Sequence, residues 1–302
     1  MRRDALAAGL TAVILWGLAP VATRAVVGHL SPLPLLLLRM VMASLVLLPW
    51  ALPALTRLRR PRTLGRLLAA GLLGFVGYQL LVTLGLRLLP ASTVGLLLAT
   101  EPVWVLVLGR LLFGERGGLR PWLGSAAALA GVAVLAGPGA ITGAGGYRAL
   151  AGIGLVLAST LSFAAYTIVL RPLSAELGAV TATAASTIVG TLPYLAFAWT
   201  LPGAGLPHLG AVIWLDLVFL GVGSAAVGML LWNVAILAES ASRVSLLLYL
   251  EPVVSVAAAA VFLGERVTPA LAGGGLLILA GVAVASMSSP ALAMGRRGRR
   301  ER

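Results

Sequence analysis

Two stretches of the chain decide its fold: ASTVGLLLATEPV at residues 91–103 and ASRVSLLLYLEPV at residues 241–253. They lie 150 residues apart, and the same offset pairs the Gly-Glu-Arg triplet at 114–116 with that at 264–266. Over residues 91–134 against 241–284, 19 of 44 positions are identical. Apolar residues match by chance in any two membrane helices, but a repeated Glu-Pro pair and a repeated Gly-Glu-Arg triplet in one register do not. The chain therefore contains two copies of one unit.

The composition places both copies in a membrane. Of the 302 residues, 60% are hydrophobic and 10% are charged, and the mean hydropathy is +1.05. A water-soluble protein could not cover so much apolar surface. Exposed strands would leave backbone groups unpaired in lipid, and a bilayer core of about 30 Å needs about 20 apolar residues per helix. We predict an all-α integral membrane protein with ten transmembrane helices at residues 5–24, 33–53, 67–86, 91–112, 120–137, 150–170, 179–200, 210–236, 242–263 and 269–288.

The arginines orient these spans. With the N-terminus in the cytoplasm, 17 of the 22 basic residues fall on the cytoplasmic side, four fall on the opposite side, and Arg39 falls inside the second span. This asymmetry predicts that both termini are cytoplasmic. Five spans per copy is an odd number, so the second copy enters the membrane from the opposite face. Such inverted repeats are a recurring plan of secondary transporters, with the substrate site near the midplane where the halves meet.

Several other classes of function are excluded. The net charge of +13 does not indicate nucleic-acid binding, because the arginines gather in short loops and in a basic tail at residues 289–302. The chain has no cysteine, and His29 and His208 are too few for a zinc site. Phosphate-binding loops, HExxH and nucleophile elbows are missing from the sequence. We therefore expect no enzyme activity, no metal and no cofactor.

Two Glu-Pro pairs are predicted to lie deep in the membrane, Glu101-Pro102 in the fourth span and Glu251-Pro252 in the ninth. Each proline removes a backbone donor, so we expect kinked helices in which the carbonyl of Leu98 or Leu248 lacks its usual partner. The structural interpretation is that the pairs hold the kinks and tie helices together.

The functional interpretation is that a glutamate takes up a proton or contacts a cationic group of the substrate. An acidic side chain at this depth costs at least about 2.5 kcal/mol, so it should face protein or a water-filled cavity. Arg39 is the candidate partner for Glu101 or Glu251. For Glu115 and Glu265, which follow the same spans, the alternatives are interface anchoring and gate-forming salt bridges.

Aromatic and amide side chains inside the spans suggest a shared cavity, since each needs a hydrogen-bond partner in lipid. The 150-residue offset aligns Trp16 with Tyr166, at the same depth in the first helix of each copy. Ordinary packing is the alternative for each residue alone. The candidate substrate-binding residues are Trp16, Tyr78, Gln79, Tyr166, Trp232, Asn233 and Tyr249.

Taken as a set, these features resemble the EamA family of the drug/metabolite transporter superfamily. The resemblance rests on Trp16-Gly17, Arg39, Glu101-Pro102 with Gly114-Glu115, and Glu251-Pro252 with Gly264-Glu265. It implies two EamA repeats, at residues 5–137 and 150–288, in a carrier of the bacterial plasma (inner) membrane that works by alternating access without ATP. In amino-acid exporters of the family, aromatic residues line the central cavity, and here Trp16, Tyr78 and Tyr166 match them, with Gln79 beside Tyr78.

We therefore expect a secondary transporter that exports amino acids or related small metabolites. Arg39, Glu101, Pro102, Glu251 and Pro252 would shape, gate or couple the transport path. The alternative is proton-coupled efflux of drugs or hydrophobic cations. The expected partners are a small-molecule substrate and the lipid bilayer, with no nucleic acid and an open oligomeric state.

Overall fold

The computed structural model describes residues 3–57, 60–113, 119–136, 146–198, 209–238 and 244–286. The predicted tail at residues 289–302, Gly114-Glu115 and His208 lie outside these residues. Within these ranges every regular element is a helix.

The helices match the ten predicted spans. Eight helical segments are long and apolar enough to cross a membrane, and two shorter apolar helices, Leu247–Leu263 and Pro269–Ala285, occupy the positions of the last two spans. The ten-helix, two-repeat prediction is thereby confirmed. The sixth span is longer than predicted, because its helix continues from Gly146 to Leu177 through Pro172.

The first repeat contains α1 (Arg3–Val26), α2 (Pro32–Ala51), the 3₁₀-helix η1 (Leu52–Arg57), α3 (Pro61–Ala70), the π-helix η2 (Gly71–Gly77), α4 (Tyr78–Leu88), α5 (Ala91–Leu98), α6 (Glu101–Phe113) and α7 (Leu119–Ala136). The second contains α9 (Gly146–Leu177), α10 (Ala179–Ala198), α11 (Ala211–Val218), the π-helix η3 (Phe219–Val227), α12 (Gly228–Ala238), the 3₁₀-helix η4 (Ser245–Leu250), α14 (Glu251–Leu263) and α15 (Pro269–Ser286).

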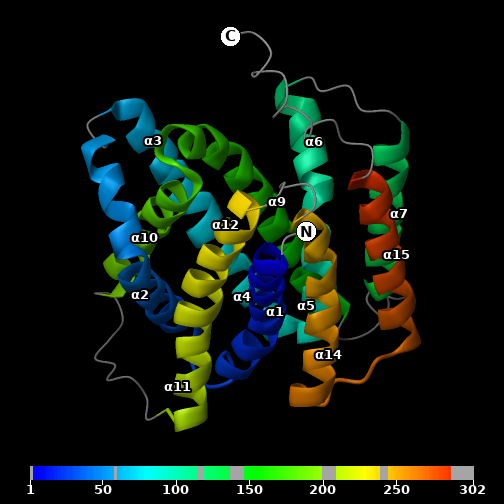
Figure 1. Ribbon diagram of the computed structural model, residues 1–302. Coiled ribbons are helices and arrows are strands. Elements are labelled where there is room, and N and C mark those ends of the chain that lie inside the picture. The colour runs from blue at the N-terminus through cyan, green and yellow to red at the C-terminus, as the bar shows by residue number, and fades with distance from the viewer. Residues whose placement is uncertain are drawn as a thin grey trace.

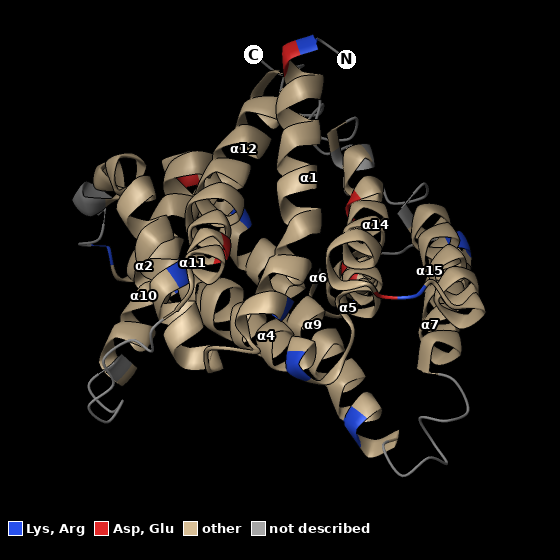
Figure 2. Ribbon diagram, turned by 90° about the horizontal axis from the view of Figure 1, so that it is seen from below, with Lys and Arg blue, Asp and Glu red and all other residues tan. Residues whose placement is uncertain are grey.

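The bundle has α1 at its centre, and α7 and α15 stand together at one edge (Figures 1 and 2). Helices α2 and α10 lie at the opposite edge. The apolar core has two main parts, one around α2 and α10 and the other around α5, α14 and the α7–α15 pair. Charged residues are sparse over the ribbon, as lipid exposure requires (Figure 2).

A glycine seam joins α7 to α15 and repeats the internal symmetry. A methyl group added to Gly124 would lie 2.4 Å from the carbonyl oxygen of Gly281, and one added to Gly131 would lie 2.6 Å from that of Gly274. The 150-residue offset exchanges these two contacts, because it aligns Gly124 with Gly274 and Gly131 with Gly281. The two helices therefore cross through equivalent surfaces, as expected for units related by a pseudo-two-fold axis.

A π-helix interrupts the third helix of each repeat. The amide of Tyr78 donates to the carbonyl of Leu73, and the amide of Gly228 donates to that of Gly223. Both bonds span five residues, and the 150-residue offset superposes one on the other. A π-turn displaces the normal hydrogen-bond ladder and frees backbone carbonyls, a feature often found at functional sites.

The Glu-Pro pairs begin new helices rather than kink continuous ones. Helix α5 ends at Leu98 and α6 begins at Glu101, while η4 ends at Leu250 and α14 begins at Glu251. Proline is favoured in the first turn of a helix, because its missing donor has no partner there. The predicted free carbonyl on Leu248 is wrong, since the 3₁₀ geometry of η4 lets the amide of Glu251 reach it.

Candidate functional site

The first helix of each repeat places an aromatic ring on the π-helix segment of the other repeat. The indole Nε1 of Trp16 donates to the carbonyl oxygen of Ser224 at 3.0 Å. The ring of Tyr166 packs against Gly74, where an added methyl would lie 2.6 Å from the ring. The repeat offset aligns Trp16 with Tyr166 and Ser224 with Gly74, so the two contacts are symmetry-equivalent. The two residues that the sequence repeat aligns therefore make equivalent contacts in the structure.

A chain of aromatic rings extends from Tyr166. Its ring centroid lies 5.6 Å from that of Phe75 and 5.2 Å from that of Phe163, and Phe163 lies 4.8 Å from Tyr78. The hydroxyl of Tyr194 donates to the carbonyl oxygen of Phe75 at 2.8 Å, inside η2. The freed backbone of the π-helix is thus satisfied by a side chain from α10, and the rings form one continuous surface.

Tyr78 connects this surface to the membrane-embedded charges. Its hydroxyl lies within electrostatic range of Glu251, Glu101 and Arg39. Glu101 and Glu251 are also in range of each other, and Arg39 is in range of Tyr194. Residues from α2, α4 and α6 of the first repeat and from α14 of the second therefore lie in one region.

Arg39 does not pair with either glutamate, so this part of the prediction is wrong. Arg39 is only 6% exposed, and its Nε atom is buried without a hydrogen-bond partner among the described residues. Both glutamates are half-buried, and neither carboxylate makes a hydrogen bond or ion pair with another residue that the structure describes. Charged groups in such places are costly unless paired or hydrogen-bonded, so one cation and two acids are left to interact with water or a ligand.

The remaining predicted residues divide into two groups. Trp232 lies beside Trp16, with ring centroids 5.3 Å apart, and Gln79 is buried next to Tyr78 with its Oε1 atom unpartnered. Asn233 instead donates to the carbonyl oxygen of Met229 in its own helix at 2.9 Å. Tyr249 points toward α15, where its hydroxyl lies 3.4 Å from the carbonyl oxygen of Val282.

The structure adds residues that the sequence-based prediction missed. Tyr194, Phe163 and Phe75 join the aromatic surface. The position of Tyr194 in the repeat is occupied by Ser44 in the first copy, so comparing the two copies gave no signal. An aromatic residue with a hydrogen-bonding hydroxyl inside a predicted span was the signal that could have identified it.

Known proteins resemble this chain over nearly its whole length. The model of the EamA-like transporter family matches residues 4–137 and 150–287. A probable terminal-alkyne amino-acid exporter of Streptantibioticus cattleyicolor is 30% identical over 273 residues, covering 89% of this chain and 89% of the relative. A probable amino-acid metabolite efflux pump of Salmonella typhimurium is 29% identical over 291 residues, covering 93% and 94%.

Relatives whose names give only a transporter also match. An uncharacterized transporter of Archaeoglobus fulgidus is 29% identical over 274 residues, covering 88% of this chain and 93% of the relative. One solved crystal structure has a TM-score of 0.64 and 25% identity, and the match covers 95% of this chain and 98% of the other.

Proposed function

This chain belongs to the EamA-like transporter family and is a membrane transporter, and from this premise we propose that it exports amino acids or related small metabolites as a secondary carrier. The names of two relatives support the substrate class, since one is a probable terminal-alkyne amino-acid exporter and the other a probable amino-acid metabolite efflux pump. The proposed path lies between the two repeats and alternates its access between the two membrane faces.

One observation carries the substrate assignment: Arg39, Glu101 and Glu251 lie within electrostatic range of the hydroxyl of Tyr78 and have no ion-pair partner among the described residues. An amino acid carries a carboxylate and an ammonium group on one carbon atom. The guanidinium of Arg39 would bind the carboxylate through charge-assisted hydrogen bonds, and Glu101 or Glu251 would bind the ammonium group. A dipolar substrate thereby compensates both signs of charge, which a neutral or singly charged molecule cannot do.

The aromatic surface would receive the substrate side chain. The rings of Phe75, Phe163 and Tyr166 are apolar and can stack against different side chains. Trp16, the repeat equivalent of Tyr166, forms a second aromatic contact with Trp232. Pro102 and Pro252 would allow the two parts of each broken span to tilt, because the helix is already interrupted there. Gln79 supplies an unpartnered carbonyl oxygen beside Tyr78.

In the cell we place the carrier in the bacterial inner membrane with both termini in the cytoplasm. The supporting observation is the excess of arginine in the loops assigned to the cytoplasmic side.

The site performs binding and release, and needs neither a cofactor nor a chemical step on the substrate.

The test is counterflow in liposomes that contain the purified protein. Liposomes are loaded with an unlabelled amino acid, and uptake of the labelled compound is followed for a panel of amino acids and small amphiphiles. The proposal predicts transient accumulation of at least one amino acid. If no amino acid accumulates while gel filtration shows monodisperse protein, the proposal fails.

The second candidate is proton-coupled efflux of drugs or hydrophobic cations. The two unpaired glutamates beside an aromatic surface favour it, because a lipophilic cation could use the same groups. It predicts that an ethidium-like cation, rather than an amino acid, is moved when a pH gradient is imposed. It also predicts that Glu101→Gln or Glu251→Gln abolishes coupling to that gradient, whereas Arg39→Gln leaves cation efflux intact.

A further inference from the structure

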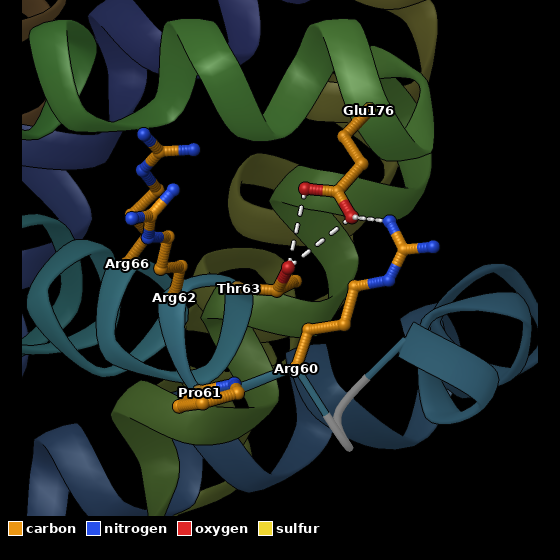
Figure 3. A pocket seen from close by; sticks show the side chains of 6 residues that line it. All are labelled: Arg60, Pro61, Arg62, Thr63, Arg66 and Glu176. Atoms are coloured by element: carbon orange, nitrogen blue, oxygen red, sulfur yellow. Dashed lines mark hydrogen bonds and ion pairs between the residues drawn. The ribbon is translucent and has the colours of Figure 1, made fainter.

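A second charged cluster lies far from this site, where α3 begins and α9 ends (Figure 3). It surrounds a pocket of about 380 Å³ lined by Arg60, Pro61, Arg62, Thr63, Arg66 and Glu176. With three arginines and one glutamate, the pocket carries a net charge of +2 (3 − 1). Nothing in the proposed transport path uses these residues.

On one side of the pocket, the carboxylate of Glu176 is held by neighbouring side chains. Its carboxylate accepts hydrogen bonds from the hydroxyl of Thr63 at 3.2 Å to each oxygen, and it forms an ion pair with Arg60 at 3.3 Å. Thr63 is only 2% exposed, so the contact joins α3 to α9 inside the protein. These bonds neutralise Arg60 and satisfy Glu176.

Arg62 and Arg66 remain unpaired. They are four residues apart on α3, so they share a face of the helix, and their side chains lie next to each other across the pocket from Glu176 (Figure 3). Neither side chain makes an ion pair or hydrogen bond with any other residue in the described part of the chain. Two like charges at this spacing destabilise a helix, and an anion bound between them would remove the repulsion.

The depth of the pocket in the membrane indicates whether such an anion is a lipid phosphate or a free anion from solution. The candidate span begins at Pro61, so Arg66 lies about 8 Å along the helix from its start at about 1.5 Å per residue. The headgroup region on each side of a bilayer is about 5–8 Å thick. Leu64 and Leu68 of the same helix are 39% and 45% exposed and one turn apart, as expected for side chains that face lipid. We therefore place the pocket at the depth of the lipid phosphates.

We propose that Arg62 and Arg66 bind the phosphodiester of an anionic phospholipid in the pocket between α3 and α9. Each guanidinium can donate two hydrogen bonds to a phosphate, which a lysine could not do in the same geometry. The bound headgroup would hold α3, and with it the π-helix η2 that follows, against α9.

The test measures the thermal unfolding midpoint of the purified protein in neutral detergent with added lipid. Phosphatidylglycerol should raise the Tm by about 3 °C or more, whereas phosphatidylcholine and millimolar inorganic phosphate should not. The Arg62→Gln/Arg66→Gln variant should lose this shift. The control variant Arg148→Gln/Arg266→Gln, which has the same net charge, should keep it.

Folding of the variant is checked separately by gel filtration in detergent. Arg62→Lys/Arg66→Lys keeps the charge and provides a second variant, for which we expect a reduced shift. An equal lipid shift in the wild type and the Gln variant would overturn the proposal. A shift produced equally by inorganic phosphate, or lost equally in the control variant, would also overturn it.

Discussion

The carboxylate of Glu265 accepts a hydrogen bond from the backbone amide of Ala91 at 2.7 Å. Its other oxygen accepts from the amide of Ser92 at 3.0 Å and from the Ser92 hydroxyl. Glu265 therefore caps the N-terminus of α5, where free amides and the helix dipole favour a negative charge. Among the described residues it forms no salt bridge, and its hydrogen bonds do more than anchor it at an interface. The cap joins the repeated Gly-Glu-Arg motif of the second copy to the repeated Ala-Ser motif of the first.

Removal of this cap should destabilise the protein. We expect Glu265→Ala to lower the free energy of unfolding by about 1–2 kcal/mol, because two amides and a hydroxyl lose their acceptor. The measurement is unfolding in mixed micelles followed by tryptophan fluorescence. The neighbouring exposed residue provides the control, Arg266→Gln, which should change the free energy by less than about 0.5 kcal/mol. Equal effects of the two substitutions would show that the cap contributes nothing.

The glycine seam should not tolerate even one methyl group. Gly124→Ala places Cβ 2.4 Å from the carbonyl oxygen of Gly281, a backbone atom that cannot move alone. We expect a loss of about 1–3 kcal/mol in the free energy of unfolding. Gly273→Ala on α15 is the matched control, because an added methyl there meets nothing within 4 Å. If both variants are as stable as the wild type, α7 and α15 do not pack as described.

The two buried tyrosine hydroxyls should contribute differently to stability. Tyr194→Phe leaves the carbonyl of Phe75 in the π-helix without its donor and should cost about 1 kcal/mol. The hydroxyl of Tyr166 is buried near Ser186 and Thr183 but makes no well-formed hydrogen bond with the residues that the structure describes, so Tyr166→Phe should be close to neutral. Thermal unfolding of both variants under one set of conditions provides the comparison. A larger loss in Tyr166→Phe than in Tyr194→Phe would contradict the assigned contacts.

The sequence predicted the spans and the two copies well, because lipid leaves few options. Backbone groups must be satisfied within helices, and the Glu-Pro pairs fix the register of the repeat. The π-helices could not be predicted, since Gly71, Gly74 and Gly77 also suit close packing in an ordinary helix. That packing is present as well, because an added methyl at Gly71 would lie 2.8 Å from the amide of Gly190.

The site was harder to predict than the fold. Residue position in a span gives depth, but it does not give the direction in which a side chain points. Arg39, Glu101 and Glu251 lie within electrostatic range of Tyr78, yet the expected ion pair is not formed. Tyr249 has a suitable depth but points toward α15. Direction depends on helix rotation and on the breaks at Leu98 and Leu250, which a hydropathy pattern does not specify.

In the proposed site Arg39 recognises the carboxylate of an amino acid, and a counterflow comparison tests this role. Counterflow is compared for the best-transported amino acid and for the amine that lacks its carboxylate, in wild-type and Arg39→Gln liposomes. The account predicts that Arg39→Gln lowers amino-acid flux about ten-fold or more while flux of the amine is unchanged or higher, because only the carboxylate loses its partner. The exposed-arginine control Arg87→Gln should behave as wild type. An Arg39→Gln variant that moves the amino acid as fast as the wild type would contradict the account.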